Sequence, residues 1–522
     1  MPIRMEKDPQ KNTGGQRPND PGRRNSGGLG SLAKLLPFIL MFLFKRPKLL
    51  IPVLLIGGVW YFFLGGSQML SGGNQVADNE FDDSMFSMGA SFDLEKYDQT
   101  EVFAPLASGS WNGLPNKVSL EAYAPRRGQQ GRQGSCVGWA SAYSASTILH
   151  SRATGKDPNS VAFSPAYLYN QIALEGCQGA YMLDAMKAMY QNGGLPYNDF
   201  KYDESSCRRF PQNNQIAKGR QYKIKGYNRL TLDHDRYTPD ILAIKQNIAQ
   251  GAPVVIGMQV GGTFMSRMVG QKVWRPTQRD YTQRGFSGHA MTVIGYDDNL
   301  DGGAFQIMNS WGDRWGDRGF GWVRYRDFET FVKEAYGLYP MGSADKFDDK
   351  KLAVEFGLLD LKTEKTIAME RRGDMSFKTV RPINKGDKFK VLVANSIECY
   401  IYVFGQETDG SSYVLFPYTE KHSPYCGITG TRLFPRDYSM VADNIGNTDY
   451  MAVVVSKREL NFNELNRAIN NSRQSSYASK LKEALGNQRI SNVSFQAGNT
   501  VSFSADASDK NIVGVVLALD KR

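Results

Sequence analysis

Residues 130–140 read Gln-Gly-Arg-Gln-Gly-Ser-Cys-Val-Gly-Trp-Ala and restrict the local fold more than any other stretch of the chain. The two glycines allow a tight bend, because glycine tolerates backbone angles that other residues avoid. Ser135 is a favourable N-cap, and the residues from Cys136 to about His150 are good helix formers with an apolar stripe. The pattern predicts a loop that leads into a helix with Cys136 in its first turn. The partial positive charge there favours a reactive thiolate, although a buried structural cysteine is the alternative interpretation.

Two further segments, 288–296 and 305–312, predict a β-hairpin around an Asp- and Gly-rich turn. A symmetric hairpin centred on Asn299 would set His289 directly opposite Asn309, with β-carbons about 4.5–5.5 Å apart. At that distance the amide oxygen could accept a hydrogen bond from one imidazole nitrogen and leave the other nitrogen facing a thiol. A bulge of one residue would destroy this register.

The turn of the hairpin also matches the first half of a calcium loop, through Asp297, Asn299, Asp301 and Gly302. That pattern then requires Glu where the chain has Met308, so we expect no calcium here. The chain has five cysteines and four histidines without a Cys-x-x-Cys pair, which leaves little for a zinc site. We therefore expect neither a metal nor an organic cofactor.

The cysteines leave the redox compartment open. If Cys136 is the reactive one, the other four could form two local bridges, Cys177–Cys207 and Cys399–Cys426, which would suit an oxidising compartment. Four buried free thiols are equally compatible with the sequence.

Taken together, the three segments resemble those of the papain family of cysteine proteases. Gln130 falls six residues before the candidate nucleophile, where the family keeps its oxyanion-hole glutamine. By the same resemblance Cys136 matches the nucleophile, His289 the base and Asn309 the residue that orients the base. Trp311 matches the tryptophan that shields the contact between the Asn and His side chains.

The resemblance extends to a substrate-binding wall at Gly179 and Ala180, and it includes departures. Gln133 stands where family members have a bridging cysteine, so Cys177 lacks its usual partner. Ala180 replaces the second glycine of the wall. No typical inhibitory prodomain is evident before residue 120.

Over roughly residues 120–340, the resemblance implies an α+β fold with a helical lobe and a β-barrel-like lobe, which we place at 121–340. It implies a cysteine-type peptidase that acts on peptide or protein substrates without a cofactor. A transglutaminase or acyltransferase could use a similar core, but those usually carry Asp at the position of Asn309. A catalytically silent binding or scaffold protein on the same fold is the remaining alternative.

The C-terminal residues 351–522 contain alternating apolar runs, which predict a β-rich, sandwich-like accessory domain with one helix at about 463–485. This domain resembles accessory domains attached to bacterial proteases. Its partner cannot be inferred from the sequence.

The N-terminal region predicts a membrane anchor. Residues 1–34 are polar and basic and indicate a disordered tail, and 35–66 form an anchor region with an uncharged span at 49–66. An acidic spacer follows at 67–120. This charge asymmetry predicts an uncleaved signal-anchor with a cytoplasmic N-terminus and an extracytoplasmic catalytic domain, periplasmic or extracellular. A cleaved signal peptide is the alternative.

The formal net charge of +11 could suggest a nucleic-acid partner. The sequence has no basic stripe with interleaved aromatic residues, however, so none is expected.

Overall fold

The computed structural model describes residues 3–7, 86–102, 104–107, 113–232, 237–339, 350–436 and 438–522. Residues 83–522 and the first eight residues belong to one compact unit. The expected span at 49–66 lies outside the described residues. Within the described ranges, no helix has the length and apolar character needed to cross a membrane.

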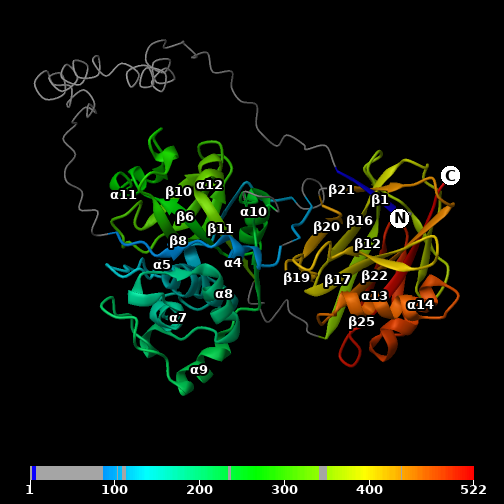
Figure 1. The fold of residues 1–522 in the computed structure, drawn as a ribbon, viewed down its shortest axis with the longest axis horizontal. Helices are drawn as coiled ribbons and strands as arrows, with labels where there is room; N and C mark the ends of the chain where they lie inside the picture. Colours follow the sequence, from blue (N-terminus) through cyan, green and yellow to red (C-terminus); the bar gives the residue numbers. More distant parts are fainter. Residues whose placement is uncertain are drawn as a thin grey trace, which may run out of the picture. The chain divides into compact units, whose positions relative to one another are not determined.

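An antiparallel sheet forms one half of the region up to residue 339 (Figure 1). Its strands follow the order β5 (Tyr227–Arg229), β11 (Val332–Leu338), β6 (Val254–Val260), β8 (Ser287–Asp297), β9 (Ala304–Met308), β10 (Phe320–Arg324) and β7 (Val273–Trp274). The short β3 (Lys117–Ser119) pairs with β8, and only β7 runs parallel to its neighbour. The central strands β6 and β8 are almost entirely buried, which explains their continuous apolar runs.

Helices form the other half, and Figure 1 shows α5, α7, α8 and α9 gathered together. They are α5 (Cys136–Gly138), the π-helical segment η4 (Trp139–Ser146), α6 (Thr147–Thr154), α7 (Pro165–Ile172), α8 (Met182–Gln191) and α9 (Asn213–Gly219). The helices α10 (Ile241–Ala249), α11 (Thr263–Ser266) and α12 (Tyr325–Phe331) accompany the strands. The start of α7 follows from its sequence, because Ser164 accepts a hydrogen bond from the Tyr167 amide (3.0 Å) and Pro165 occupies the first turn.

The region from 350 onward contains two packed sheets, in agreement with the predicted β-rich region. The first has the order β1 (Ile3–Lys7), β21 (Tyr438–Ala442), β16 (Lys388–Asn395), β12 (Lys351–Asp360), β24 (Val501–Asp506) and β23 (Ser494–Ala497), with β13 (Lys365–Thr366) on β12 and β20 (Gly430–Phe434) on β16. The second has the order β14 (Met369–Arg371), β15 (Ser376–Thr379), β25 (Ile512–Asp520), β22 (Thr448–Ser456), β17 (Cys399–Gln406) and β18 (Ser412–Phe416), with β19 (Tyr425–Cys426) on β17. Alternate residues of both sheets, such as Phe356 and Val453, share one apolar core.

Two helices, and not the single one expected at 463–485, cover the second sheet. The helix α13 (Phe462–Asn471) ends before α14 (Tyr477–Leu485) begins. The break occurs because Ser476 caps α14 by accepting a hydrogen bond from the Ser479 amide (3.1 Å). Ile469 and Leu481 pack with Val454 in a separate apolar cluster.

The N-terminus also differs from expectation. Within the segment 1–34, predicted to be disordered, residues 3–7 form β1 and pair antiparallel with β21. The other residues of that segment lie outside the described ranges.

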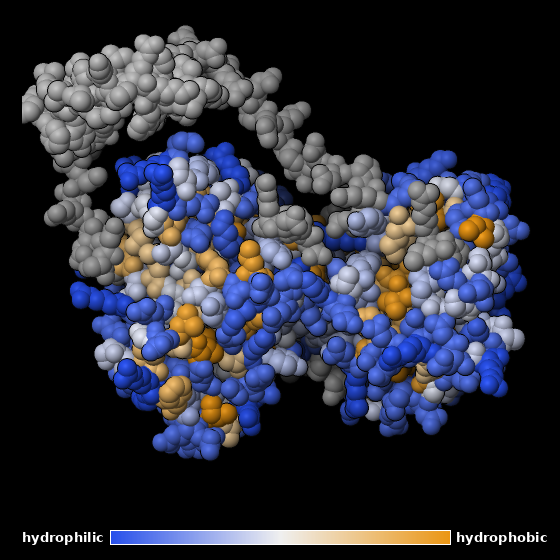
Figure 2. All heavy atoms as spheres, in the orientation of Figure 1, coloured by the Kyte–Doolittle hydropathy of each residue, from blue (hydrophilic) through white to orange (hydrophobic). Residues whose placement is uncertain are grey.

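The visible surface of the described residues is mostly hydrophilic, with apolar side chains in small groups (Figure 2). Most large apolar side chains lie instead in the buried clusters of the two regions.

Candidate functional site

The candidate nucleophile begins a helix, as its sequence predicts. Cys136 is the first residue of α5, which continues through η4 and α6 to residue 154. Its side chain is fully buried, and its Sγ accepts a hydrogen bond from the backbone amide of Ala290 (3.4 Å). Ser135 occupies the N-cap position but makes no side-chain capping bond. The thiol therefore lies against β8, at the residue that follows His289.

The candidate base is oriented by the candidate amide. The Nε2 atom of His289 and the Oδ1 atom of Asn309 lie 2.7 Å apart, and the imidazole ring stacks on Trp311 with ring centroids 4.3 Å apart. In the neutral imidazole, the proton that Nε2 donates to the amide oxygen leaves the other ring nitrogen, Nδ1, unprotonated. Among the described residues Nδ1 has no hydrogen-bond partner. It is thus available to take a proton from a thiol.

The predicted hairpin register is wrong, although the two side chains meet. A register shift lies between Val293 and Gly295, and Thr292 pairs with Met308. Asn309 lies just beyond the end of β9, and its backbone N–H donates to the Gly319 carbonyl (3.1 Å). The contact with His289 is therefore made across an irregular end of the hairpin and not between directly opposed residues.

The candidate oxyanion residue is buried and fixed at both ends of its side chain. The Nε2 group of Gln130 donates to the carbonyl oxygen of Gln133 (3.0 Å), and its Oε1 accepts from the hydroxyl of Ser310 (2.7 Å). The Ser310 amide in turn donates to Asn309 Oδ1 (2.7 Å). Ser310 therefore links the glutamine to the amide that orients His289, a connection that the sequence analysis missed.

A segment of the chain itself covers the site. Residues 86–92 include β2 (Ala90–Ser91), which pairs in parallel with β4 (Ala180–Tyr181) beside the predicted substrate-binding wall. The Gly89 amide donates to the Gly288 carbonyl (3.2 Å), and the Gly89 carbonyl accepts from the Ala180 amide (2.9 Å). Gly89 therefore joins the residue before His289 to the wall residue Ala180.

The contacts of this segment leave no room for a side chain at its centre. A β-carbon added at Gly89 would lie 2.1 Å from the carbonyl oxygen of Gly134, and one at Gly179 would lie 2.6 Å from the carbonyl oxygen of Gly89. At the other end, Phe86 stacks on Trp311 at 4.8 Å, and the indole N–H of Trp311 donates to the Ser87 carbonyl (2.9 Å). Residues 86–92 therefore occupy the space in which the resemblance to the papain family predicts that substrate binds.

Burial sets the protonation of the catalytic candidates. Loss of solvent raises the pKa of the Cys136 thiol to about 12, while neighbouring backbone amides, including that of Ala290, act in the opposite direction. Burial likewise lowers the pKa of His289 to about 4, against the hydrogen bond to Asn309, which raises it. In this arrangement burial favours the neutral form of both groups. Burial thus opposes the thiolate that the helix start favours.

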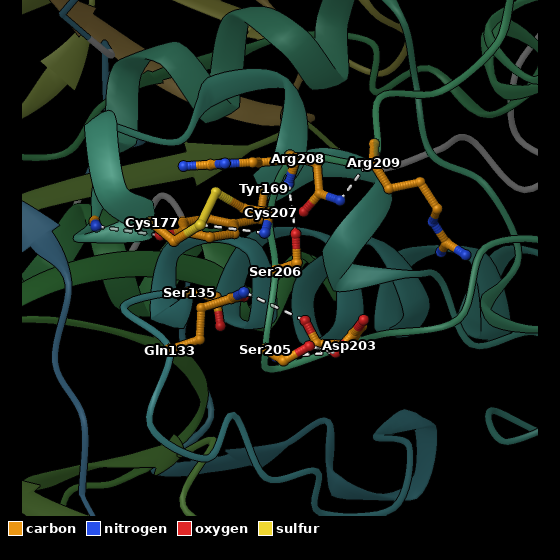
Figure 3. The surroundings of a disulfide bond; sticks show 12 residues. Gln133, Ser135, Tyr169, Cys177, Asp203, Ser205, Ser206, Cys207, Arg208 and Arg209 are labelled. Atoms are coloured by element: carbon orange, nitrogen blue, oxygen red, sulfur yellow. Dashed lines mark hydrogen bonds between the residues drawn. A yellow bond between two sulfur atoms is a disulfide. The ribbon is translucent and has the colours of Figure 1, made fainter.

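The four other cysteines include both one disulfide and two free thiols, the two states that the sequence left open. Cys177 and Cys207 form a disulfide (Figure 3), whereas Cys399 and Cys426 are free buried thiols. The latter pair lie opposite each other on β17 and β19.

The structure gives no metal site among the residues it describes. No group of three or more His, Cys, Asp or Glu side chains there could hold an ion. The carboxylates of the calcium-like turn instead form ion pairs, Asp297 with Lys117 and Asp301 with Arg275.

Comparison with known proteins identifies the region that carries these residues. The family model described as "Papain family cysteine protease" matches residues 122–337. The chain contains a papain family cysteine protease domain. This domain has the papain-like fold, and the β-rich region is additional to it.

Cathepsin K of Mus musculus is 26% identical over 232 residues, which cover 43% of this chain and 63% of the relative. An uncharacterized peptidase C1-like protein of Acanthamoeba polyphaga mimivirus is 29% identical over 199 residues, which cover 37% of this chain and 61% of the relative. The chain thus spans about three fifths of the length of these two curated relatives. Among solved structures, xylellain, a cysteine protease from Xylella fastidiosa, is 23% identical with a TM-score of 0.39, and the match covers 48% of this chain and 94% of that one.

Proposed function

We propose that this chain is a cysteine-type peptidase that hydrolyses peptide bonds, with Cys136 as nucleophile, His289 as base and Asn309 as the residue that orients the base. The contact that carries the proposal is the 2.7 Å hydrogen bond between His289 and Asn309, on the strand whose Ala290 amide donates to the Cys136 thiol. The papain family match over residues 122–337 supports the reaction class.

The reaction follows from the free Nδ1 atom of His289. This nitrogen takes the thiol proton, and the thiolate of Cys136 attacks the peptide carbonyl carbon to form a C–S bond. The second N–H of the Gln130 amide and the backbone N–H of Cys136 would hold the oxyanion. When the C–N bond breaks, His289 gives its proton to the leaving amine. It then deprotonates a water that hydrolyses the thioester and regenerates the thiol.

The covered site sets a condition on this activity. Gly89 is bonded to both Gly288 and Ala180, so a substrate cannot reach Cys136 until residues 86–92 move away. Such a displacement would also return water to the site and bring the pKa values of Cys136 and His289 closer together. The proposed peptidase is therefore active only in the fraction of molecules in which this segment is displaced.

Peptide hydrolysis tests the function directly. The purified chain should cleave a fluorogenic peptide library, and Cys136→Ala and His289→Ala should abolish cleavage. Cys399→Ala, which removes a buried thiol far along the chain, is the matched control and should retain cleavage. Cleavage that survives Cys136→Ala would refute the proposal.

A catalytically silent binding or scaffold protein is the second candidate. The observation that favours it is the complete burial of Cys136 and His289. A scaffold should keep its cellular role in the Cys136→Ala variant, whereas a peptidase should lose it.

Single-pass anchoring through residues 49–66, with the N-terminus in the cytoplasm and the catalytic domain outside, is a further proposal supported by the apolar run. A single crossing would separate residues 3–7 from 438–442, which are paired as β1 and β21, so the two arrangements exclude each other within one chain. Met5 lies opposite Met440 in that pairing. If the variant that carries both Met5→Cys and Met440→Cys forms a disulfide between these positions in cells, the anchored arrangement is excluded. If no disulfide forms, and the membrane protects the cysteine of Met5→Cys from a thiol reagent added outside the cell, the anchored arrangement is supported.

A further inference from the structure

The loop that carries the oxyanion glutamine lacks the covalent support expected from the family resemblance. Gln133 occupies the position of the bridging cysteine, and Cys177 is bonded instead to Cys207 (Figure 3). The loop 130–135 must therefore be held in another way. Two of its residues, Gln130 and Ser135, are completely buried.

Tyr202 connects the two ends of this loop. Its hydroxyl donates to the backbone carbonyl of Gln130 (2.7 Å). The hydroxyl of Ser135 lies 2.6 Å from the same oxygen. Because Tyr202 has one proton and gives it to Gln130, Ser135 must be the donor in the second bond. One phenol thus binds both the oxyanion glutamine and the residue that immediately precedes Cys136.

The residues after Tyr202 also contact the loop 130–135, and a disulfide joins them to the segment beside the predicted substrate-binding wall. Gln133 Nε2 donates to the carbonyl oxygen of Asp203 (3.3 Å), as Figure 3 shows. Four residues further along, Cys207 carries the disulfide to Cys177, close to the wall glycine Gly179. The Tyr202 ring packs on Trp139 with centroids 4.9 Å apart, which fixes the direction of its hydroxyl.

We propose that Tyr202 is a positioning residue for the oxyanion site, and that its two hydrogen bonds across the loop 130–135 replace the missing disulfide. The two oxyanion donors are the side chain of Gln130 and the amide of Cys136, which lie at the two ends of this loop. The bridge through Tyr202 fixes their separation. The inference rests on the proposed function, because it concerns the transition state of that reaction.

Tyr202→Phe tests this role, since it removes the hydroxyl and keeps the ring. We expect kcat for peptide hydrolysis to fall about tenfold with KM unchanged, less than the 10²–10³ for complete loss of an oxyanion donor. Alkylation of Cys136 by iodoacetamide forms no oxyanion, so its rate should stay the same. Tyr197→Phe is the control: its ring packs on Tyr143, and in the part of the chain described here its hydroxyl makes no bond to the loop.

A double-mutant cycle separates positioning from general support. If Tyr202 acts through Gln130, Tyr202→Phe should have little effect on kcat in the Gln130→Ala background. An undiminished effect there, an unchanged kcat in the single variant, or an equal loss of alkylation rate would overturn the proposal.

Hydrogen exchange gives a readout that does not depend on activity. The backbone amides of residues 131–136 should exchange faster in Tyr202→Phe than in the parent chain. Unchanged exchange would overturn the proposal that Tyr202 stabilises this loop. If Cys136 is alkylated in every variant but no peptide is cleaved by the parent chain, the proposed function fails, while the exchange result still decides whether Tyr202 braces the loop.

Discussion

At the scale of single residues, the side-chain amide of Gln130 is held by hydrogen bonds at both its oxygen and its nitrogen. Ser310 donates to its Oε1, and one N–H of its Nε2 donates to Gln133; among the residues that the structure describes, the other N–H has no partner and could donate to an oxyanion. We expect Gln130→Ala to lower kcat by about 10²–10³ with a small change in KM, as measured by steady-state hydrolysis. The adjacent exposed Gln129→Ala is the control, and equal losses in both variants would contradict the assignment.

A second residue, Glu334, links stability to pH. Burial raises its pKa to about 8, while hydrogen bonds from Tyr336 and the Asp93 amide act in the opposite direction. The folded state therefore binds this proton more tightly than the unfolded state, whose pKa is near 4.5. Ionisation of this buried carboxyl therefore lowers the free energy of unfolding. The loss is absent below about 4.5, grows as pH rises, and is complete above about 8.

Glu334→Gln should remove this dependence. The free energy of unfolding of the variant, measured with denaturant from pH 4.5 to 8, should exceed that of the parent chain by an amount that increases with pH. His289, whose pKa is lowered, contributes the opposite slope at the acidic end, but it is present in both proteins and cancels in the difference. A difference that does not vary with pH would contradict the protonated state of Glu334.

At the scale of elements, the segment 86–92 decides whether the site is open. Gly89→Ala places a β-carbon against the Gly134 carbonyl, and overpacking of this kind costs about 1–3 kcal/mol. We expect the variant to populate the open state about ten- to hundredfold more and to cleave peptides faster by a similar factor. Gly113→Ala is the control, because a β-carbon there meets no atom within 4 Å. Equal rates for Gly89→Ala and the parent chain would show that this segment does not limit access.

Some features of these elements could be predicted from the sequence, and others could not. The helix start at Cys136 and the strand around His289 were predictable, because local composition and alternation determine both. The hairpin register was not, since Asp297 pairs with Ala304 and the turn is therefore centred after Leu300 and not on Asn299. The segment 86–92 had no periodic signal, because its strand pairs with β4, far away in the sequence, through backbone atoms alone.

At the scale of the whole molecule, the division into a papain family domain and a β-rich region followed from composition and motifs. The sandwich strands were predictable from alternation, whereas the break between α13 and α14 depends on one capping serine, Ser476. The pairing of β1 with β21 joins residues more than four hundred positions apart, and no local pattern indicates it. Tyr202 was missed for a similar reason, because its role arises only when its loop folds against residues 130–135.

The central claim is that Cys136 and His289 form a reactive pair once the site is uncovered. The most direct test is limiting alkylation of the Gly89→Ala chain at pH 5.5, mapped by mass spectrometry, because ordinary thiols with a pKa of about 8.5 react slowly there. We predict faster labelling of Cys136 than of Cys399 or Cys426, with the difference lost in the His289→Ala background. Labelling of Cys136 that is as slow as that of the other two thiols, or that is unaffected by removal of His289, would contradict the account.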